Sequence, residues 1–477
     1  MHPLDFQQHT RRAFLRRSGQ LALAGTALPV ALNLAAMGEA AAFNATDYKA
    51  LVCLFMHGGN DHANTVVPYD AGQYGRYSTI RSSIALDHGA LAATLLTPRT
   101  PLGGGRQYAL HPAMTGLAGL FNAGKAAVQL NVGPLVVPLT RAQYDSGSRT
   151  LYPLPPRLFS HNDQQSIWQS SSPEGSTVGW GGNLGDLALA GNGNSLFTCI
   201  SVSGNAVFLS GDTALQYEVS TGGAVPINGI GARVYGSSAV QHALATLAQQ
   251  PRSHLLENAY TAMTVRAVGA ESRINGALAG ATLATPFSSG NPLADQLKMV
   301  ARLIAARGTL GTTRQVFFVS MGGFDLHDNL VSKHPALLGR VSDALASFHA
   351  ATVELGVADK VTAFTASDFG RTLTSNGDGS DHGWGSHHFI VGGAVQGQAF
   401  YGSPPPISIG DTAAAEDQWH VGQGRLLPST SIDQYAATLA TWFGVAPSEL
   451  AGILPNLSHF GAAAGRADYP VNLGFMA

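Results

Sequence analysis

Two short apolar runs in the second half of the chain, 315–320 and 361–365, constrain its fold most strongly. Each run lies between turn signals, and this pattern predicts two strands buried on both faces of a sheet. Polar clusters follow the runs at 322–329 and 367–371, and a histidine-rich stretch comes next at 381–388. Because ligands gather beyond the carboxyl ends of strands in open α/β sheets, we expect the functional site at this edge.

Candidate metal ligands stand at these two strand ends and at an earlier one. The apolar run 48–56 predicts another buried strand, and Gly58 and Gly59 after it let the backbone turn tightly and approach a ligand. Divalent metals such as Zn²⁺ take histidine nitrogens and carboxylate oxygens. The candidate ligands, enough for one or two ions, are Asp61, Asp325, His327, Asp368, His382, and His387 or His388.

Each of these residues also has a structural interpretation when it is considered alone. Asp61 and its neighbour Asn60 suit a turn or a helix cap, and an isolated histidine is usually satisfied by hydrogen bonds. The position of the candidates at successive strand ends is what favours the metal site.

Ser160 is the candidate nucleophile. The sequence from Ser160 to Asp163 has the pattern of a helix N-terminus. A hydroxyl at such an end is stabilised by the helix dipole when it ionises, and the free N–H groups suit an anionic ester. The alternative is that Ser160 only caps the helix.

The N-terminal 42 residues predict export. Residues 10–16 (Thr-Arg-Arg-Ala-Phe-Leu-Arg) resemble the twin-arginine consensus, 21–36 have the apolar character of a signal peptide, and 40–42 offer a cleavage site of small residues. We expect the twin-arginine translocase as a partner and a periplasmic or secreted mature protein, 43–477, without a stable membrane span. The alternative of an uncleaved anchor is disfavoured by the many Ala and Gly residues and by Pro29.

Composition bears on the partners of the protein and on the state of its cysteines. The net charge of -2 with 12% charged residues gives no basis for binding nucleic acid or an anionic membrane. The two cysteines, Cys53 and Cys199, lie in apolar runs, so we expect buried thiols rather than a disulfide.

The rest of the chain alternates strand and helix patterns, which predicts one large α/β domain. A helix at 111–123 before a strand at 126–132 gives a β-α-β start and a parallel sheet. The segment 196–285 breaks this alternation, and we expect an inserted subdomain or lid there. Apolar residues with helical spacing recur at 293–304, 337–348 and 432–442.

Five motifs together resemble those of a bacterial family catalogued as domain of unknown function 1501, and more broadly those of the alkaline phosphatase and sulfatase superfamily. The resemblance covers almost the whole mature chain. The motifs are Gly-Gly-Asn-Asp (58–61), Ser-His-x-Asp-Gln (160–164), Gly-Gly-Phe-Asp-x-His (322–327), Asp-Phe-Gly-Arg-Thr (368–372) and Asp-His-Gly-Trp-Gly (381–385).

This resemblance implies a large, mostly parallel sheet flanked by helices, as in alkaline phosphatase, with one or two divalent ions at a hydrolytic site. Zn²⁺ is the first expectation, and Ca²⁺, Mg²⁺ or Mn²⁺ are the alternatives. The implied roles are Asp61 and Asp368 at one ion, Asp325, His327 and His382 at the other, Ser160 as the nucleophile and Arg371 as a clamp for the anionic group.

The chain departs from the superfamily pattern at three places. Phe369 stands where a histidine ligand is expected, unless His387 or His388 substitutes for it, and Asn329 stands where a histidine should follow Asp325. The Cys-x-Pro-x-Arg motif of formylglycine sulfatases is absent.

Three hypotheses of function follow. The first is an exported metal-dependent hydrolase of phosphate or sulfate esters, with a substrate on a surface glycan or lipid. The second is a non-catalytic periplasmic binding or cell-surface assembly protein that kept the fold, as the missing histidine suggests. The third, an oxidoreductase, has the least support because no haem, iron–sulfur or dinucleotide motif is present.

Overall fold

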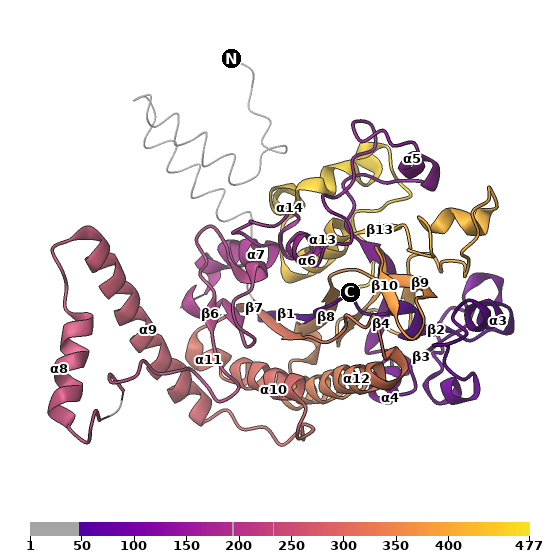
Figure 1. Ribbon diagram of the computed structural model, residues 1–477. Coiled ribbons are helices and arrows are strands. Elements are labelled where there is room, and N and C mark those ends of the chain that lie inside the picture. The colour runs from indigo at the N-terminus through magenta and orange to yellow at the C-terminus, as the bar shows by residue number, and fades with distance from the viewer. Residues whose placement is uncertain (1–46, 193–194, 232) are drawn as a thin grey trace, which may run out of the picture.

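A nine-stranded sheet forms the centre of the computed structural model, which describes residues 47–192, 195–231 and 233–477 (Figure 1). The strand order is β12-β4-β11-β8-β1-β7-β5-β6, with β13 paired to β4, and the pairs are parallel except those that β11 makes with β4 and β8. This confirms the predicted α/β fold with a large, mostly parallel sheet. The strands are β1 (Lys49–Met56), β4 (Ala126–Gly133), β5 (Cys199–Ser201), β6 (Tyr217–Glu218), β7 (Arg314–Met321), β8 (Val361–Ser367), β11 (Ser386–Gly392), β12 (Phe400–Tyr401) and β13 (Thr430–Ser431).

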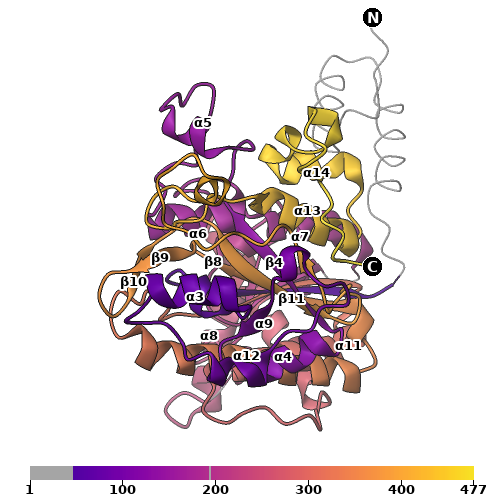
Figure 2. The ribbon, with the colours of Figure 1, turned by 90° about the vertical axis from the view of Figure 1, so that its right-hand side faces the viewer.

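Strand β1 shows why the sheet is covered on both faces. Val52 and Leu54 pack into one apolar cluster with helices α4, α10 and α12, whereas Leu51 and Phe55 pack into a second cluster with α6, α7 and α13. Figure 2 shows α4 and α12 on one side of the sheet and α6 and α13 on the other. The helices are α4 (Thr115–Asn122), α6 (His161–Ser170), α7 (Trp180–Ala188), α10 (Pro292–Ala305), α12 (Leu330–Glu354) and α13 (Ile432–Phe443).

Most local predictions for the sheet and its helices are confirmed. Strands β1, β7 and β8 and helices α10, α12 and α13 form where the apolar patterns placed them. Cys53 and Cys199 are free and buried. Strands β1 and β4 of the predicted β-α-β start run parallel in this sheet, but they are not neighbours, because β8 and β11 lie between them. Apolar periodicity identifies a strand but not its neighbours, so the strand order had no local signal.

The segment 196–285, expected to be an insertion, is divided between the sheet and a projecting arm. Its short strands β5 and β6 extend one edge of the sheet. Its helices α8 (Ser238–Gln249) and α9 (Leu255–Ala279) form a hairpin that projects from the body (Figure 1).

The remaining elements are short or lie at the periphery. Within the part of the chain described here, no helix has the length and apolar character needed to cross a membrane. The predicted signal peptide lies outside the described residues. The remaining strands and helices are β2 (Val66–Pro68), β3 (Tyr108–Leu110), β9 (Arg371–Ser375), β10 (Ser380–His382), α3 (Ala71–Ile80), α5 (Arg141–Asp145), α11 (Arg307–Leu310) and α14 (Pro447–Ile453).

The buried carboxyl group of Asp433 at the start of α13 makes the stability of the fold depend on pH. Burial raises its pKa from 3.8 to about 6, although hydrogen bonds from Asn456 and Ser431 oppose the shift. Because the folded pKa lies above the unfolded one, the stabilisation is complete below about pH 4 and is lost as the pH rises through about 6. We expect Asp433→Asn to be more stable than the wild type at pH 7 by roughly 2–3 kcal/mol, with no advantage at pH 4. Urea unfolding at both pH values measures this, and a difference between the proteins that does not change with pH would contradict it.

Candidate metal centre

Three parallel strands end at the same level and bring their following loops together. Met56 at the end of β1 pairs in register with Met321 of β7 and with Ser367 of β8. Asp325 and Asp368 follow these last two strands by only a few residues, as the sequence predicted.

The glycines after β1 allow the three loops to approach closely. Gly58 and Gly59 have φ angles of +116° and +81°, which side-chain-bearing residues rarely adopt. A Cβ atom on Gly58 would lie 2.4 Å from the backbone nitrogen of Asp325, and one on Gly59 would lie 2.5 Å from the ring of Phe369. The loop can therefore pass between the other two only because it has no side chains at these positions.

Three imidazole rings converge on the carboxylate of Asp325. The Nε2 atoms of His327 and His382 lie 3.0 and 3.3 Å from Asp325 Oδ1, and the Nε2 atom of His161 lies 3.5 Å from Oδ2. One ligand atom from each of His161, Asp325 and His382 falls within 4.8 Å of the others. The side chains of Asp325 and His327 are 43% and 44% exposed, so the cluster is open to solvent.

The opposite nitrogen of each ring has an acceptor that fixes its tautomer. His161 donates its Nδ1–H to Asp368 Oδ2 (2.6 Å), and His327 donates its Nδ1–H to Asp381 Oδ1 (3.0 Å). His382 donates its Nδ1–H to the carbonyl oxygen of Phe159 (2.7 Å). All three Nε2 lone pairs are therefore free to bind, and acceptors of this kind on the second nitrogen are typical of histidines that hold a metal.

Two of these rings lie close enough to share a cation. The Nε2 atoms of His327 and His382 are 2.9 Å apart, and neither bears the proton of its neutral ring. Two lone pairs at this distance repel each other unless a proton or a metal ion lies between them. Histidine nitrogens and a carboxylate oxygen are typical ligands of Zn²⁺. His161, Asp325 and His382 therefore fit one divalent ion, and His327 lies beside them as a further candidate ligand.

Electrostatics keep Asp325 ionised. Partial burial would raise its pKa, but the hydrogen bond and the charge of Arg371 outweigh this effect and lower the pKa below its usual value. Arg371 itself is buried, and its Nη1 atom donates to Asp325 Oδ1 (2.7 Å) and to the carbonyl oxygen of Gly58 (3.2 Å), while Nη2 donates to the carbonyl oxygen of Ser380 (2.5 Å). Its guanidinium therefore holds the site together, in contrast to the anion-clamp role implied by the family resemblance.

Two predicted carboxylate ligands lie outside this cluster. Asp61 is buried and pairs with Arg81 Nη2 (2.5 Å), and it also accepts a hydrogen bond from Ser380 Oγ (2.6 Å). Asp368 accepts from His161, from Gln165 Nε2 (2.8 Å) and from the backbone N–H of Gly58 (3.1 Å). The contacts of Asp61 do not support the predicted ligand role, and Asp368 orients a histidine instead.

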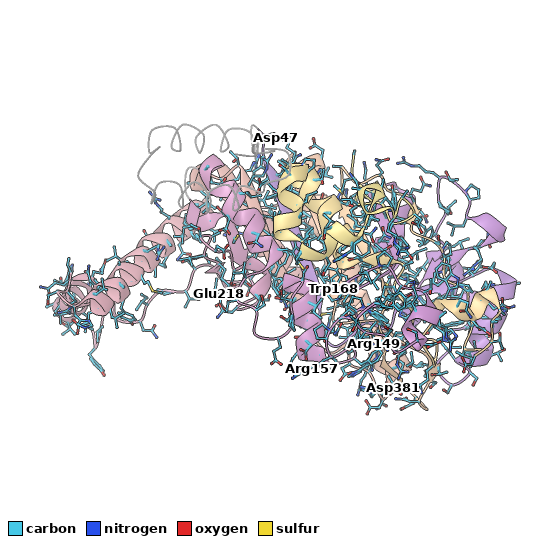
Figure 3. The ribbon with its side chains drawn as sticks, turned by 90° about the horizontal axis from the view of Figure 1, so that it is seen from above. Asp47, Arg149, Arg157, Trp168, Glu218 and Asp381 are labelled. Carbon is cyan, nitrogen blue, oxygen red and sulfur yellow. The ribbon has the colours of Figure 1, made fainter. Side chains whose placement is uncertain are left out.

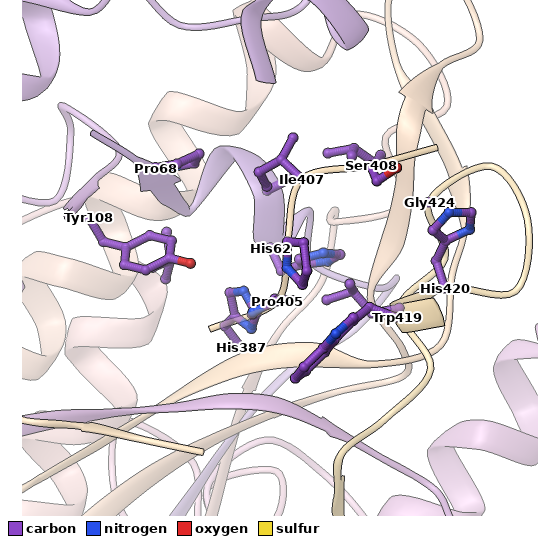
Figure 4. A pocket seen from close by; sticks show the side chains of 15 residues that line it. His62, Pro68, Tyr108, His387, Pro405, Ile407, Ser408, Trp419, His420 and Gly424 are labelled. Atoms are coloured by element: carbon purple, nitrogen blue, oxygen red, sulfur yellow. The ribbon is translucent and has the colours of Figure 1, made fainter. Parts of the chain in front are cut away.

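The predicted ligands His387 and His388 are core residues of β11. His387 accepts a hydrogen bond from the backbone N–H of Asn131 (3.1 Å) and lines a separate pocket with His62 (Figure 4). The ring of His388 packs against Trp168, with 4.7 Å between ring centres. Neither residue belongs to the cluster. The segment 381–388 is therefore not one histidine-rich turn, because a strand begins at Ser386.

His161 was not among the predicted ligands, although it adds to the cluster an imidazole that Phe369 cannot supply. The ring of Phe369 packs against those of His161 and His382, with centre distances of 4.8 and 4.5 Å, and these two imidazole rings also contact each other (4.4 Å). His161 directly follows Ser160 in the Ser-His-x-Asp-Gln motif, and that position was the available signal.

Ser160 lies at the edge of the metal centre as the N-cap of α6. Its hydroxyl does not cap the helix but donates to Asp163 Oδ2 (2.9 Å). The first-turn N–H groups of α6, those of His161, Asn162 and Asp163, have no acceptor among the described residues. Asp381 of this site is labelled in Figure 3, with Arg157 of the loop that leads to Ser160.

Comparisons with known proteins place the chain in a family without assigning a reaction. A family model described as "Protein of unknown function (DUF1501)" matches residues 48–423, and no curated protein matches. Among solved structures, the chain is similar to the lipoteichoic acid synthase LtaP from Listeria monocytogenes (9% identity, 76% of this chain and 68% of that chain, TM-score 0.30). It is also similar to Ps i-CgsB in complex with k-i-k-neocarrahexaose (10% identity, 84% of this chain and 73% of that chain, TM-score 0.36). A third similar structure is the PsFucS1 sulfatase from Pseudoalteromonas sp. (10% identity, 80% of this chain and 68% of that chain, TM-score 0.31). Because the identities and TM-scores are this low, we assign no residue of this chain a role from these structures.

The ligand set can be tested by metal analysis. We expect the wild type to bind one equivalent of Zn²⁺ and His382→Ala to lose it, because that variant removes one of three converging lone pairs. The exposed His242 of α8 provides a control, since His242→Ala should keep the ion. Plasma mass spectrometry of the dialysed proteins measures the stoichiometry.

The variant Asp61→Asn tests whether Asp61 is a metal ligand or only the ion-pair partner of Arg81. It should keep the ion but lose ~3–5 kcal/mol of stability, because the buried Arg81 is left without its partner. Loss of an ion from Asp61→Asn, with two equivalents in the wild type, would instead make Asp61 a ligand.

Proposed function

The chain belongs to the DUF1501 family, whose description assigns no activity, and we propose that it is a metal-dependent hydrolase of phosphate or sulfate esters. The observation that carries this proposal is the convergence of three oriented Nε2 lone pairs on Asp325. A divalent ion held by His161, His327, His382 and Asp325 would act as a Lewis acid toward an ester oxygen. All four of these residues would hold one ion, so we propose a site with a single ion.

Ser160 is the proposed nucleophile. Its Oγ atom would form a bond to the phosphorus or sulfur atom as the bond to the leaving oxygen breaks. The proton of Ser160 would pass to Asp163, which already accepts its hydrogen bond, and the leaving oxygen would take a proton from water. A water molecule would then cleave the ester on Ser160, releasing phosphate or sulfate and restoring the hydroxyl group. Asp163 is buried, and so its carboxylate is held in place. The free N–H groups at the start of α6 would donate to the non-bridging oxygens of the ester group.

The leader sequence and this chemistry together suggest where the enzyme acts. We propose export by the twin-arginine pathway to the periplasm or beyond, with a substrate on a surface glycan or lipid. Export of a folded protein suits a site whose metal is loaded in the cytoplasm. The leader lies outside the described residues, so the support for this localisation is the sequence at 10–42.

Ser160→Ala tests the nucleophile. We expect turnover of aryl phosphate or aryl sulfate by the Zn²⁺-loaded protein to fall by at least about 10³-fold, because the attacking atom is removed. Metal content should stay at one equivalent, since Ser160 is not a ligand.

Ser166→Ala on the same helix is the matched control, because its hydroxyl only donates to the carbonyl oxygen of Pro173. Turnover should be unchanged in this variant. Full activity in Ser160→Ala would remove Ser160 from the nucleophile role. A wild type that binds the ion but turns over neither ester class would favour the non-catalytic binding protein.

A further inference from the structure

A turn near the C-terminal end of the chain places Arg425 beside the metal centre. The backbone N–H of Arg425 donates to the carbonyl oxygen of Gly422, and the N–H of Val421 donates to the carbonyl oxygen of Arg425, both at 2.9 Å. A Cβ atom on the preceding Gly424 would lie 2.3 Å from Cβ of Leu373, so the turn is packed directly on β9. The position of Arg425 is therefore well defined.

The side chain of Arg425 joins the two halves of the site. Its Nε–H donates to the carbonyl oxygen of His382 (2.8 Å), and its guanidinium carbon lies 5.3 Å from the centre of the Phe159 ring. Phe159 precedes Ser160, and its carbonyl oxygen accepts from His382 Nδ1. The guanidinium is thus held between a proposed metal ligand and the residue next to the proposed nucleophile.

The Nη1 and Nη2 groups of Arg425 have neither a hydrogen bond nor an ion pair to any described residue. Partial burial lowers the pKa of Arg425, while the charge of Asp381 opposes this shift. A half-buried guanidinium with two free NH₂ groups is poorly hydrated and keeps its fork of donors available. This arrangement suits bidentate binding of an oxyanion.

Other arginines near the site do not combine these properties. The guanidinium of Arg371 is buried in its contacts with Asp325 and backbone carbonyl groups. Arg157 is 73% exposed and lies 3.7 Å from Asp163. Arg149 stacks on Tyr144 as Arg425 does on Phe159, but it is exposed and its Nη1 atom donates to the carbonyl oxygen of Tyr144.

We propose that Arg425 binds the tetrahedral oxyanion of the substrate beside Ser160 through Nη1 and Nη2. This inference rests on the proposed ester hydrolysis and gives to Arg425 the anion-binding role that the family resemblance implied for Arg371. Cation and anion would meet in a partly desolvated position, where such hydrogen bonds are stronger than in water.

The test measures anion binding, so it does not depend on turnover. Inorganic phosphate and sulfate are titrated into the Zn²⁺-loaded protein by calorimetry. We expect Arg425→Met to weaken binding of the preferred anion roughly 10–100-fold, the range for loss of a hydrogen bond to a charged group. Arg425→Lys should restore part of the affinity because it keeps the charge but not the fork. Arg149→Met, which removes a similarly stacked guanidinium, should bind like the wild type.

Wild-type affinity in Arg425→Met, with the ion still bound, would overturn the proposal, and so would a wild type that binds neither anion. If Arg425→Met does not fold, wild-type affinity in Arg425→Lys would overturn it as well, since a single ammonium cannot make the bidentate contact. Anion binding that depends on Arg425 in a protein without turnover would keep this proposal and reject the hydrolase. Turnover that depends on Ser160 but not on Arg425 would keep the hydrolase and reject the role of Arg425.

Discussion

The common end of β7, β1 and β8 is the constraint on which the site depends. These strands are parallel and in register, so the residues that follow Met321, Met56 and Ser367 must meet at one edge of the sheet. Three loops can share this space because Gly58 and Gly59 have no side chains. The ion pair between Arg371 and Asp325 then joins the start of β9 to the loop after β7.

Orientation of the histidines is the second requirement, and each ring meets it with a different acceptor. Asp368, Asp381 and the carbonyl oxygen of Phe159 come from three separate segments. Because each acceptor holds an Nδ1–H, the lone pairs on Nε2 are directed at Asp325 before any ion binds. Asp368, which was predicted to be a ligand, therefore holds the ring of His161 in position and does not face the ion itself.

Sequence patterns predicted the strands and their polar ends but not the contacts of each side chain. The buried runs of β1, β7 and β8 are long enough to be recognised, and Asp325, His327 and His382 of the ligand cluster were proposed from their positions. His387 and His388 were grouped with them because they closely follow Asp381 and His382 in the sequence, although the strand that holds them begins at Ser386. The partner of Arg371, the tautomer of His161 and the nearness of Arg425 to His382 all depend on contacts between distant segments, which no local pattern contains.

We propose that one divalent ion binds among His161, His327, His382 and Asp325. The most direct measurement is an anomalous difference map at the zinc edge from crystals of the protein grown with Zn²⁺. We expect one peak about 2.0–2.1 Å from the three Nε2 atoms and about 2.0–2.2 Å from a carboxylate oxygen of Asp325. A map with no peak at these atoms, or with peaks at Asp61 and Asp368 instead, would show that this cluster is not the metal site.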